Sequence, residues 1–124
     1  MNATACEASH PLPSHSPAEL LANKYVAAMN SQNPDAVARC FGPDAQVEDE
    51  QRLHTGTIQI HAWIAEAFEK YHPRIEVREV TGDDGRINIT GLVSGSFDGS
   101  PVMLQHQLEH DGWLITHLAI HPAE

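Results

Sequence analysis

Three Asp-Gly turns in the second half of the chain restrict its possible folds more than any other feature. They lie at residues 84–85, 98–99 and 111–112, and each separates two runs rich in apolar and β-branched residues. Asp-Gly between such runs is the strongest short-range signal for a β-hairpin. The sequence therefore predicts a four-stranded antiparallel meander, with strands over residues 75–81, 86–97, 102–110 and 114–121.

The first half of the chain carries helix signals instead. Ser16-Pro17-Ala18-Glu19 is a helix start in which the serine caps, the proline takes the first position and the glutamate reaches back. We expect this helix to continue to about Ser31. Its apolar residues recur at helical spacing and form one inward stripe, so Tyr25 is predicted to face the interior. The stripe consists of Leu21, Tyr25, Ala28 and Met29.

Two further helices are expected before the meander. Asn33-Pro34-Asp35 starts a short one, predicted to end at Phe41 because Gly42-Pro43 cannot continue it. A third follows Gly56-Thr57 and stops at His72-Pro73. Helices with an early strand, followed by a meander, predict an α+β domain with the helices on one face of the sheet. We expect one domain over residues 17–124 and a disordered tail over residues 1–16, which lack periodicity.

A short strand between the second and third helices places a carboxylate where an apolar residue is expected. Successive side chains in a strand alternate between faces, so if Val47 points into the core, Asp49 does too. An inward carboxylate either caps or pairs with a structural group, or moves protons in a dry pocket.

The last hairpin predicts a pair of histidines. A two-residue loop at Asp111-Gly112 would place His106 opposite His117 on the inner face. That face would then also contain Leu104, Leu108, Ile115, Ala119 and His121. The outer face would be polar on one strand and apolar on the next, which favours a subunit contact and a homodimer. Its residues would be Met103, Gln105, Gln107, Glu109, Leu114, Thr116, Leu118 and Ile120.

The amino-acid composition argues against two kinds of partner, nucleic acids and membranes. With 17 acidic and 7 basic residues among 124, the net charge of −10 argues against a nucleic-acid partner. No apolar run is long enough to cross a membrane and no secretory signal is present, so we expect a cytoplasmic protein without a membrane partner. Cys6 and Cys40 are expected to be free thiols in a reducing compartment.

Residues 40–49, Cys-Phe-Gly-Pro-Asp-Ala-Gln-Val-Glu-Asp, carry a resemblance to a known family. The segment is similar to a motif of the nuclear transport factor 2-like superfamily, in its SnoaL-like and ketosteroid isomerase-like branch. Gly56 before the third helix and the Asp-Gly turn before the last strand match too, and the resemblance covers residues 17–122. It implies a cone-shaped domain, nuclear transport factor 2-like or cystatin-like, with three helices packed on a curved antiparallel sheet.

The resemblance also implies roles for single residues. Asp49 stands at the position of the general base of ketosteroid isomerases. Tyr25, 24 positions earlier, matches the tyrosine that donates to the enolate oxygen. The second acid of those enzymes has no counterpart near His106, and Glu50 stands where proline usually follows the base, which points away from steroid isomerisation itself. The superfamily also contains cyclases, dehydratases, hydrolases and non-catalytic binding modules.

Each candidate has a structural alternative. Asp49 is a base or a solvated acid at a strand end, and Tyr25 is a substrate donor or a core tyrosine. His106 and His117 handle a proton, hold a ligand or only fill the core, and no spacing supports a metal site. The expected pocket walls, which could equally be plain core, are Met29, Val47, Trp63, Phe68, Leu104, Leu108, Ala119 and His121.

The leading hypothesis is therefore a cofactor-free isomerase, cyclase or dehydratase that acts on an apolar carbonyl compound. Asp49 would abstract a proton, Tyr25 would stabilise the enolate, and His106 with His117 would return the proton or hold the ligand. The alternative is a non-catalytic module that binds a small apolar molecule or only dimerises.

Overall fold

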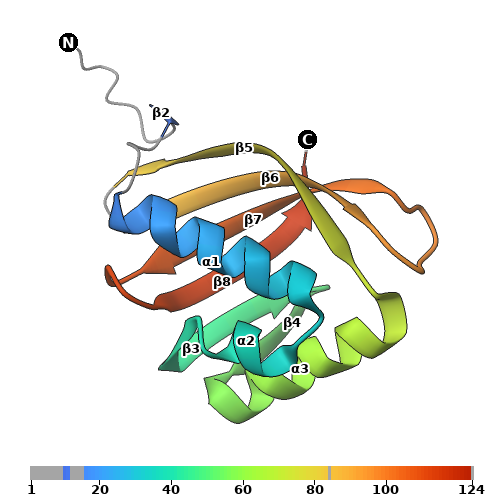
Figure 1. The fold of residues 1–124 in the computed structure, drawn as a ribbon. Coiled ribbons are helices and arrows are strands. Elements are labelled where there is room, and N and C mark those ends of the chain that lie inside the picture. The colour runs from blue at the N-terminus through green and yellow to red at the C-terminus, as the bar shows by residue number, and fades with distance from the viewer. Residues whose placement is uncertain (1–9, 12–15, 84, 124) are drawn as a thin grey trace.

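The computed structural model describes residues 10–11, 16–83 and 85–123. The chain forms three helices and, within the described residues, a seven-stranded sheet (Figure 1). The helices are α1 (Pro17–Ser31), α2 (Pro34–Ala38) and α3 (Gly56–Tyr71). The strands are β2 (His10–Pro11), β3 (Phe41–Asp49), β4 (Arg52–Thr55), β5 (Arg74–Asp83), β6 (Arg86–Ser94), β7 (Val102–His110) and β8 (Ile115–Pro122).

Helices α1 and α2 begin where their capping residues predicted. The Ser16 hydroxyl accepts a hydrogen bond from the Glu19 backbone N–H at 3.0 Å, and the Asn33 side chain accepts one from the Asp35 N–H at 3.0 Å. Both contacts satisfy backbone donors that a helix start leaves free. Helix α3 ends at Tyr71, because the next residue, His72, has a left-handed backbone (φ 47°) and is followed by Pro73.

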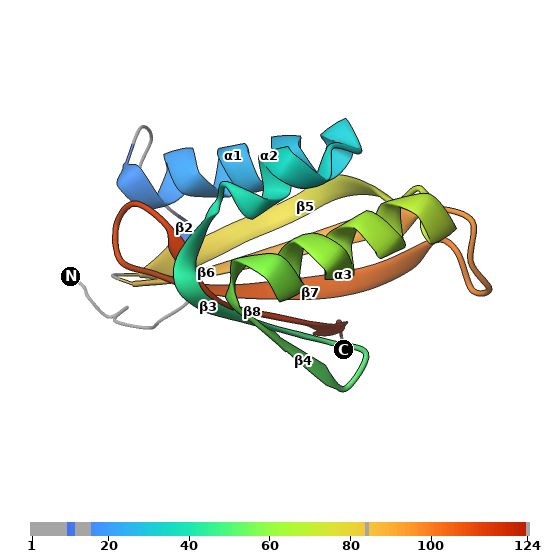
Figure 2. The same ribbon diagram turned by 90° about the horizontal axis from the view of Figure 1, so that it is seen from below.

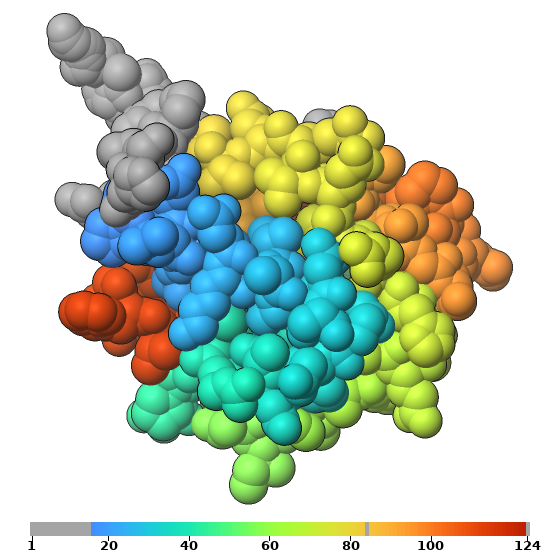
Figure 3. All heavy atoms as spheres, in the orientation of Figure 1, coloured from blue at the N-terminus to red at the C-terminus, as the bar shows by residue number. Residues whose placement is uncertain are grey.

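The curved sheet confirms the predicted α+β class and meander. Its strand order is β2-β5-β6-β7-β8-β3-β4, in which β5 to β8 pair antiparallel and β3 pairs parallel to β8. All three helices lie on one side of the sheet (Figures 1 and 2), and in Figure 3 they take up the centre and lower part of the visible face, with β5 (yellow) above them. This arrangement leaves an inner face under the helices and an outer face without helices.

The prediction for the second helix and the strand after it was wrong in its boundaries. Helix α2 ends at Ala38, and β3 already begins at Phe41, so Gly42-Pro43 lies inside a strand. The pairing of β3 with β8 is interrupted between Phe41 and Gln46. Proline lacks a backbone N–H and is tolerated where a ladder is interrupted.

Strand β4 was not predicted, because its turn carries none of the usual residues. Glu50 and Gln51 join β3 to β4 with φ angles of 54° and 64°. Two positive φ angles are typical of the tight hairpin turn that usually contains Asn-Gly. Because Glu50-Gln51 contains neither Asn nor Gly, the sequence carried no signal for this turn. The hairpin places Asp49 opposite Arg52.

The predicted register of the last hairpin was also wrong. The Asp111 carboxylate accepts hydrogen bonds from the N–H groups of Trp113 and Leu114, both at 2.9 Å, and so widens the loop to residues 111–114. His106 consequently lies opposite Ile120 and not opposite His117. The register is thus displaced by three residues. Because this number is odd, the two faces of β8 are exchanged, so Leu118 is buried and His117 lies on the outer face.

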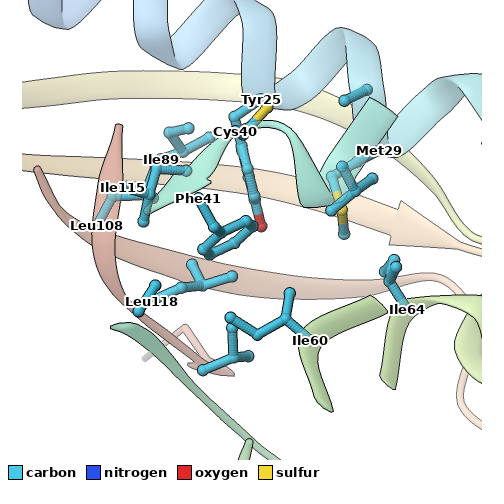
Figure 4. Close-up of a cluster of buried hydrophobic side chains, with 14 of the residues drawn as sticks. Tyr25, Met29, Cys40, Phe41, Ile60, Ile64, Ile89, Leu108, Ile115 and Leu118 are labelled. Atoms are coloured by element: carbon cyan, nitrogen blue, oxygen red, sulfur yellow. The ribbon is translucent and has the colours of Figure 1, made fainter. Parts of the chain in front are cut away.

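The core lies between the helices and the inner face of the sheet. Figure 4 shows Tyr25 extending from α1 into this cluster beside Cys40 and Phe41. Cys40 is buried and free, as expected, whereas Cys6 lies outside the described residues. Most of the predicted tail also lies outside them, although His10–Pro11 pairs with β5; the tail stays a prediction.

Candidate active site

An open cavity of about 1130 Å³ lies between α3, the end of α1 and the inner face of the sheet. Its walls are mainly apolar. Its polar lining residues include Asp49, at the end of β3, and His106, on β7. The apolar residues include Met29, Trp63, Ile64, Ala67, Ile75, Val93, Phe97, Val102, Leu104 and Ile120. Enclosure by such walls weakens competition from water for any polar contact inside.

Asp49 is partly buried and held by a tryptophan. The indole Nε1–H of Trp63, on α3, donates a hydrogen bond to Asp49 Oδ2 at 3.0 Å. Burial raises the pKa of the Asp49 carboxyl above its ordinary value and the charge of Glu50 acts in the same direction, while the Trp63 hydrogen bond and His54 lower it. A carboxylate with a raised pKa is a stronger base than a solvated one, which suits proton abstraction.

Tyr25 and His106 form a buried pair. The Tyr25 hydroxyl oxygen lies 2.7 Å from His106 Nδ1, and the two side chains are 0% and 2% exposed. Burial, followed by the charges of Asp49 and Cys40, raises the pKa of Tyr25 well above its ordinary value. Burial, followed by the charge of His121, lowers the pKa of His106 to about 4. Both groups are therefore neutral at neutral pH.

The pair also determines which ring nitrogen of His106 carries the proton. His106 Nε2 is buried and finds no hydrogen-bond partner among the described residues. If the Tyr25 hydroxyl donates to Nδ1, the only group left unsatisfied is an Nε2–H. The opposite arrangement would leave both the phenol proton and the Nε2 lone pair without partners, at the cost of two buried polar groups. His106, which lines the cavity, therefore carries a buried N–H at Nε2 that has no partner among the described residues.

Several predicted site residues meet at this cavity. Asp49 and His106 line it, as do five of the predicted wall residues: Met29, Trp63, Leu104, Ala119 and His121. Tyr25 does not line it and reaches it only through His106. The other three predicted wall residues, Val47, Phe68 and Leu108, are buried in the core and are not among the residues that line this cavity.

His117 does not join His106. It lies on the outer face, where its Nε2 is 2.8 Å from Glu48 Oε2. The predicted inner-face pair was wrong because the loop at residues 111–114 reverses the faces of β8. Sequence reasoning also missed the Trp63–Asp49 hydrogen bond. The helical spacing placed Trp63 on the inner face of α3, but no sequence signal shows which strand side chain its indole meets.

Two findings concern other kinds of site. Among residues 10–11, 16–83 and 85–123, no group of three or more His, Cys, Asp or Glu side chains is arranged to hold a metal ion. None of the helices in that part of the chain is long and apolar enough to cross a membrane.

The chain is similar to a known family. The model of the SnoaL-like domain matches residues 22–115. A candidate polyketide cyclase from Sinorhizobium meliloti is 33% identical, with 89% of this chain and 95% of that chain covered and a TM-score of 0.79. The comparison with curated proteins gives no match.

More distant solved structures share the fold. A Catenulispora acidiphila protein with a ketosteroid isomerase-like fold, in complex with trimethylamine, is 21% identical, with 83% and 85% of the two chains covered and a TM-score of 0.75. A nuclear transport factor 2-like protein from Cytophaga hutchinsonii is 10% identical, with 90% and 95% covered and a TM-score of 0.73. These likenesses confirm the predicted fold family.

Proposed function

The chain belongs to the SnoaL-like domain family, and from this premise we propose that it is an enzyme of the isomerase, cyclase or dehydratase type. It acts by general acid/base chemistry on an apolar carbonyl compound held in the cavity. The observation that carries the proposal is the presence of a base and a donor at one cavity. Asp49 is a partly buried carboxylate with a raised pKa, and His106 has a buried Nε2 without a partner.

In the proposed reaction, Asp49 removes a proton from the carbon next to the carbonyl group. The electrons of the broken C–H bond form a C=C bond, and the carbonyl π electrons move to the oxygen. The Nε2–H of His106 donates to that oxygen and stabilises its developing charge. Where a C=C bond is conjugated with the enolate, Asp49 returns the proton to its far carbon and the C=O bond re-forms, as in an isomerisation. In a cyclisation the enolate carbon attacks a second carbonyl of the same molecule, and the proton on Asp49 passes to the new alkoxide.

Trp63 and Tyr25 are positioning residues in this proposal. Trp63 binds Oδ2 of Asp49 and so leaves Oδ1 for the substrate. Tyr25 binds Nδ1 of His106 and so keeps the proton on Nε2. Tyr25 therefore acts through the histidine, whereas the family resemblance assigned it direct contact with the substrate oxygen.

The test is exchange of the α-protons of 4-phenylcyclohexanone in D₂O, followed by proton NMR. Asp49→Asn should lower the rate by about 10²-fold or more. His106→Leu, which removes the donor, should lower it by about 10²-fold, and His106→Gln, which keeps an N–H, should lose less. The matched control is His117→Gln, on the outer face, which should leave the rate unchanged. Equal losses in the His106 and His117 variants would contradict the assignment.

A non-catalytic binding module is the second candidate, because the cavity walls are predominantly apolar and the same fold hosts many functions. Such a module would bind the ketone saturably without accelerating exchange in any variant. The exchange assay and a binding titration on the same samples separate the two candidates.

The outer face of the sheet supports a homodimer. It carries Leu92 and Met103, which lie opposite each other on β6 and β7 and are half-buried. The His117–Glu48 pair lies on the neighbouring strands. A mixed apolar and polar face without helices suits a contact between two copies. A cytoplasmic location likewise remains a prediction from the sequence.

A further inference from the structure

The cavity has a strongly acidic mouth. Five carboxylates and one lysine are among its lining residues: Glu48, Asp49, Glu50, Glu66, Asp98 and Lys70. Glu50 lies in the β3–β4 turn, Glu66 on α3 and Asp98 in the β6–β7 connection, so three separate elements bring exposed negative charge to the cavity.

Most of this charge is not neutralised within the protein. Glu48 pairs with His117 on the outer face. Glu50, Glu66 and Asp98 are exposed and form no ion pair with other described residues. Unpaired charges of one sign around a cleft with low-dielectric walls concentrate the opposite charge there and repel their own.

The inner part of the cavity has different chemistry. His106, one of the lining residues, is neutral and 2% exposed, and its buried Nε2–H lacks a partner among the described residues. A buried N–H donor of this kind is matched by an uncharged acceptor such as a carbonyl oxygen. Between this donor and the mouth the walls are apolar, with residues such as Leu104, Val102 and Phe97.

We propose that the cavity binds a carbonyl compound that carries a protonated amine at the far end of an apolar spacer, and that it rejects carboxylates. The inference rests on the proposed function in taking the cavity as the substrate site. The carbonyl oxygen accepts from His106, the spacer lies along the apolar walls, and the ammonium group lies among the acids of the mouth.

The spacer is a necessary part of the substrate. An amine close to the carbonyl group would form an ion pair with Asp49 and would stop that carboxylate from acting as a base. A cavity of about 1130 Å³ is larger than a single small ketone needs, so a ring or chain can separate the two groups.

The test compares three ligands with one skeleton: 4-phenylcyclohexanone and its para-aminomethyl and para-carboxylate derivatives. The protein has two tryptophans, and Trp113 is 83% exposed. In the Trp113→Phe background, Trp63 is the only indole and reports binding at the cavity through its fluorescence. At low salt the amine should bind about tenfold more tightly than the neutral ketone, and the carboxylate about tenfold more weakly.

The mouth acids should account for this ranking. Glu50→Gln with Glu66→Gln and Asp98→Asn should reduce the ratio between amine and carboxylate to near one, as should high salt. The matched control removes three exposed acids that do not line the cavity: Asp44→Asn with Glu69→Gln and Glu79→Gln. It should preserve the ranking at the same net charge.

Three results would overturn the proposal: equal binding of amine and carboxylate, an equal effect of the control variant, or no binding of any ligand at Trp63. Failure of the proposed catalysis gives a different result. If no variant or substrate shows proton exchange while the charge ranking persists, the acid/base function fails and the charge selectivity stands.

Discussion

At the scale of single residues, the central contact is the one between Tyr25 and His106. The 2.7 Å contact orients a neutral imidazole that burial keeps unprotonated. In the proposed reaction the hydrogen-bond donor to the substrate is therefore His106, whose Nδ1 contacts Tyr25, and not Tyr25 itself, the residue that the family motif indicates.

Tyr25→Phe should allow the ring proton of His106 to move between Nε2 and Nδ1. Without the phenol, Nδ1 loses its partner, both tautomers become populated, and the free energy of unfolding should fall by about 1–3 kcal/mol. The ¹⁵N chemical shifts of the imidazole report the tautomer directly. A His106 that keeps its proton on Nε2 in the variant would show that the tyrosine does not position it.

Trp63→Phe should raise the pKa of Asp49 further. The indole N–H stabilises the charged carboxylate, so its removal favours the protonated form, since burial remains as the larger cause of the shift. Carboxyl ¹³C NMR across a pH titration measures the effect. Trp113→Phe, at an exposed tryptophan, is the control and should leave Asp49 unchanged. A lower pKa in the Trp63 variant would contradict the assigned hydrogen bond.

At the scale of elements, the β3–β4 hairpin places Asp49 at the cavity with a turn of unusual sequence. Gln51 has φ 64°, a conformation that costs most residues about 1 kcal/mol and glycine almost nothing. Gln51→Gly should therefore stabilise the protein by about 1 kcal/mol, and Gln51→Val should destabilise it. Urea unfolding measures both. Destabilisation by glycine as large as that by valine would argue against this turn.

Elements with local signals were predictable, and those fixed by tertiary contacts were not. Ser16 and Asn33 cap helices by contacts two or three residues away, so their patterns identified the helix starts. The loop at Asp111 is an exception: its contacts also span two or three residues, but an Asp-Gly pair fits either a two-residue or a longer loop, and the four-residue loop moved His117 to the outer face. Asp49 could be singled out from its motif as the candidate base, whereas its tryptophan partner depends on how α3 packs on β3.

At the scale of the whole molecule, the buried histidine should make stability depend on pH. The folded pKa of His106 is about 4, below its ordinary value of 6.5, so between these values the unfolded chain binds the proton more readily. As far as His106 is concerned, the free energy of unfolding therefore has its full value above pH 6.5 and falls by about 3 kcal/mol as the pH falls toward 4. Asp49, with its raised pKa, acts in the opposite direction.

Urea unfolding between pH 4 and 7 isolates the histidine term when the wild type is compared with His106→Gln, which cannot titrate there. The wild type should lose more stability than the variant as the pH falls. Parallel curves for the two proteins would mean that His106 is protonated as easily in the folded protein as in the unfolded chain.

The proposed homodimer is also a property of the whole molecule. Met103→Glu would place a charge in the middle of the outer face, so it should convert the dimer to a monomer in light scattering after gel filtration. Ile58→Glu is the control, because Ile58 is 87% exposed on α3, away from the outer face. A dimer that persists in the Met103 variant would place the contact elsewhere.

The account depends most on the claim that Asp49 and His106 face one bound carbonyl compound. The most direct measurement is an NMR titration with 4-phenylcyclohexanone at pH 7, observing the Asp49 carboxyl carbon and the His106 Nε2–H together. We predict that both signals shift with one dissociation constant and that the Nε2–H moves downfield as it binds the ketone oxygen. If only one signal responds, or neither does, the two groups do not share a ligand and the proposed chemistry is contradicted.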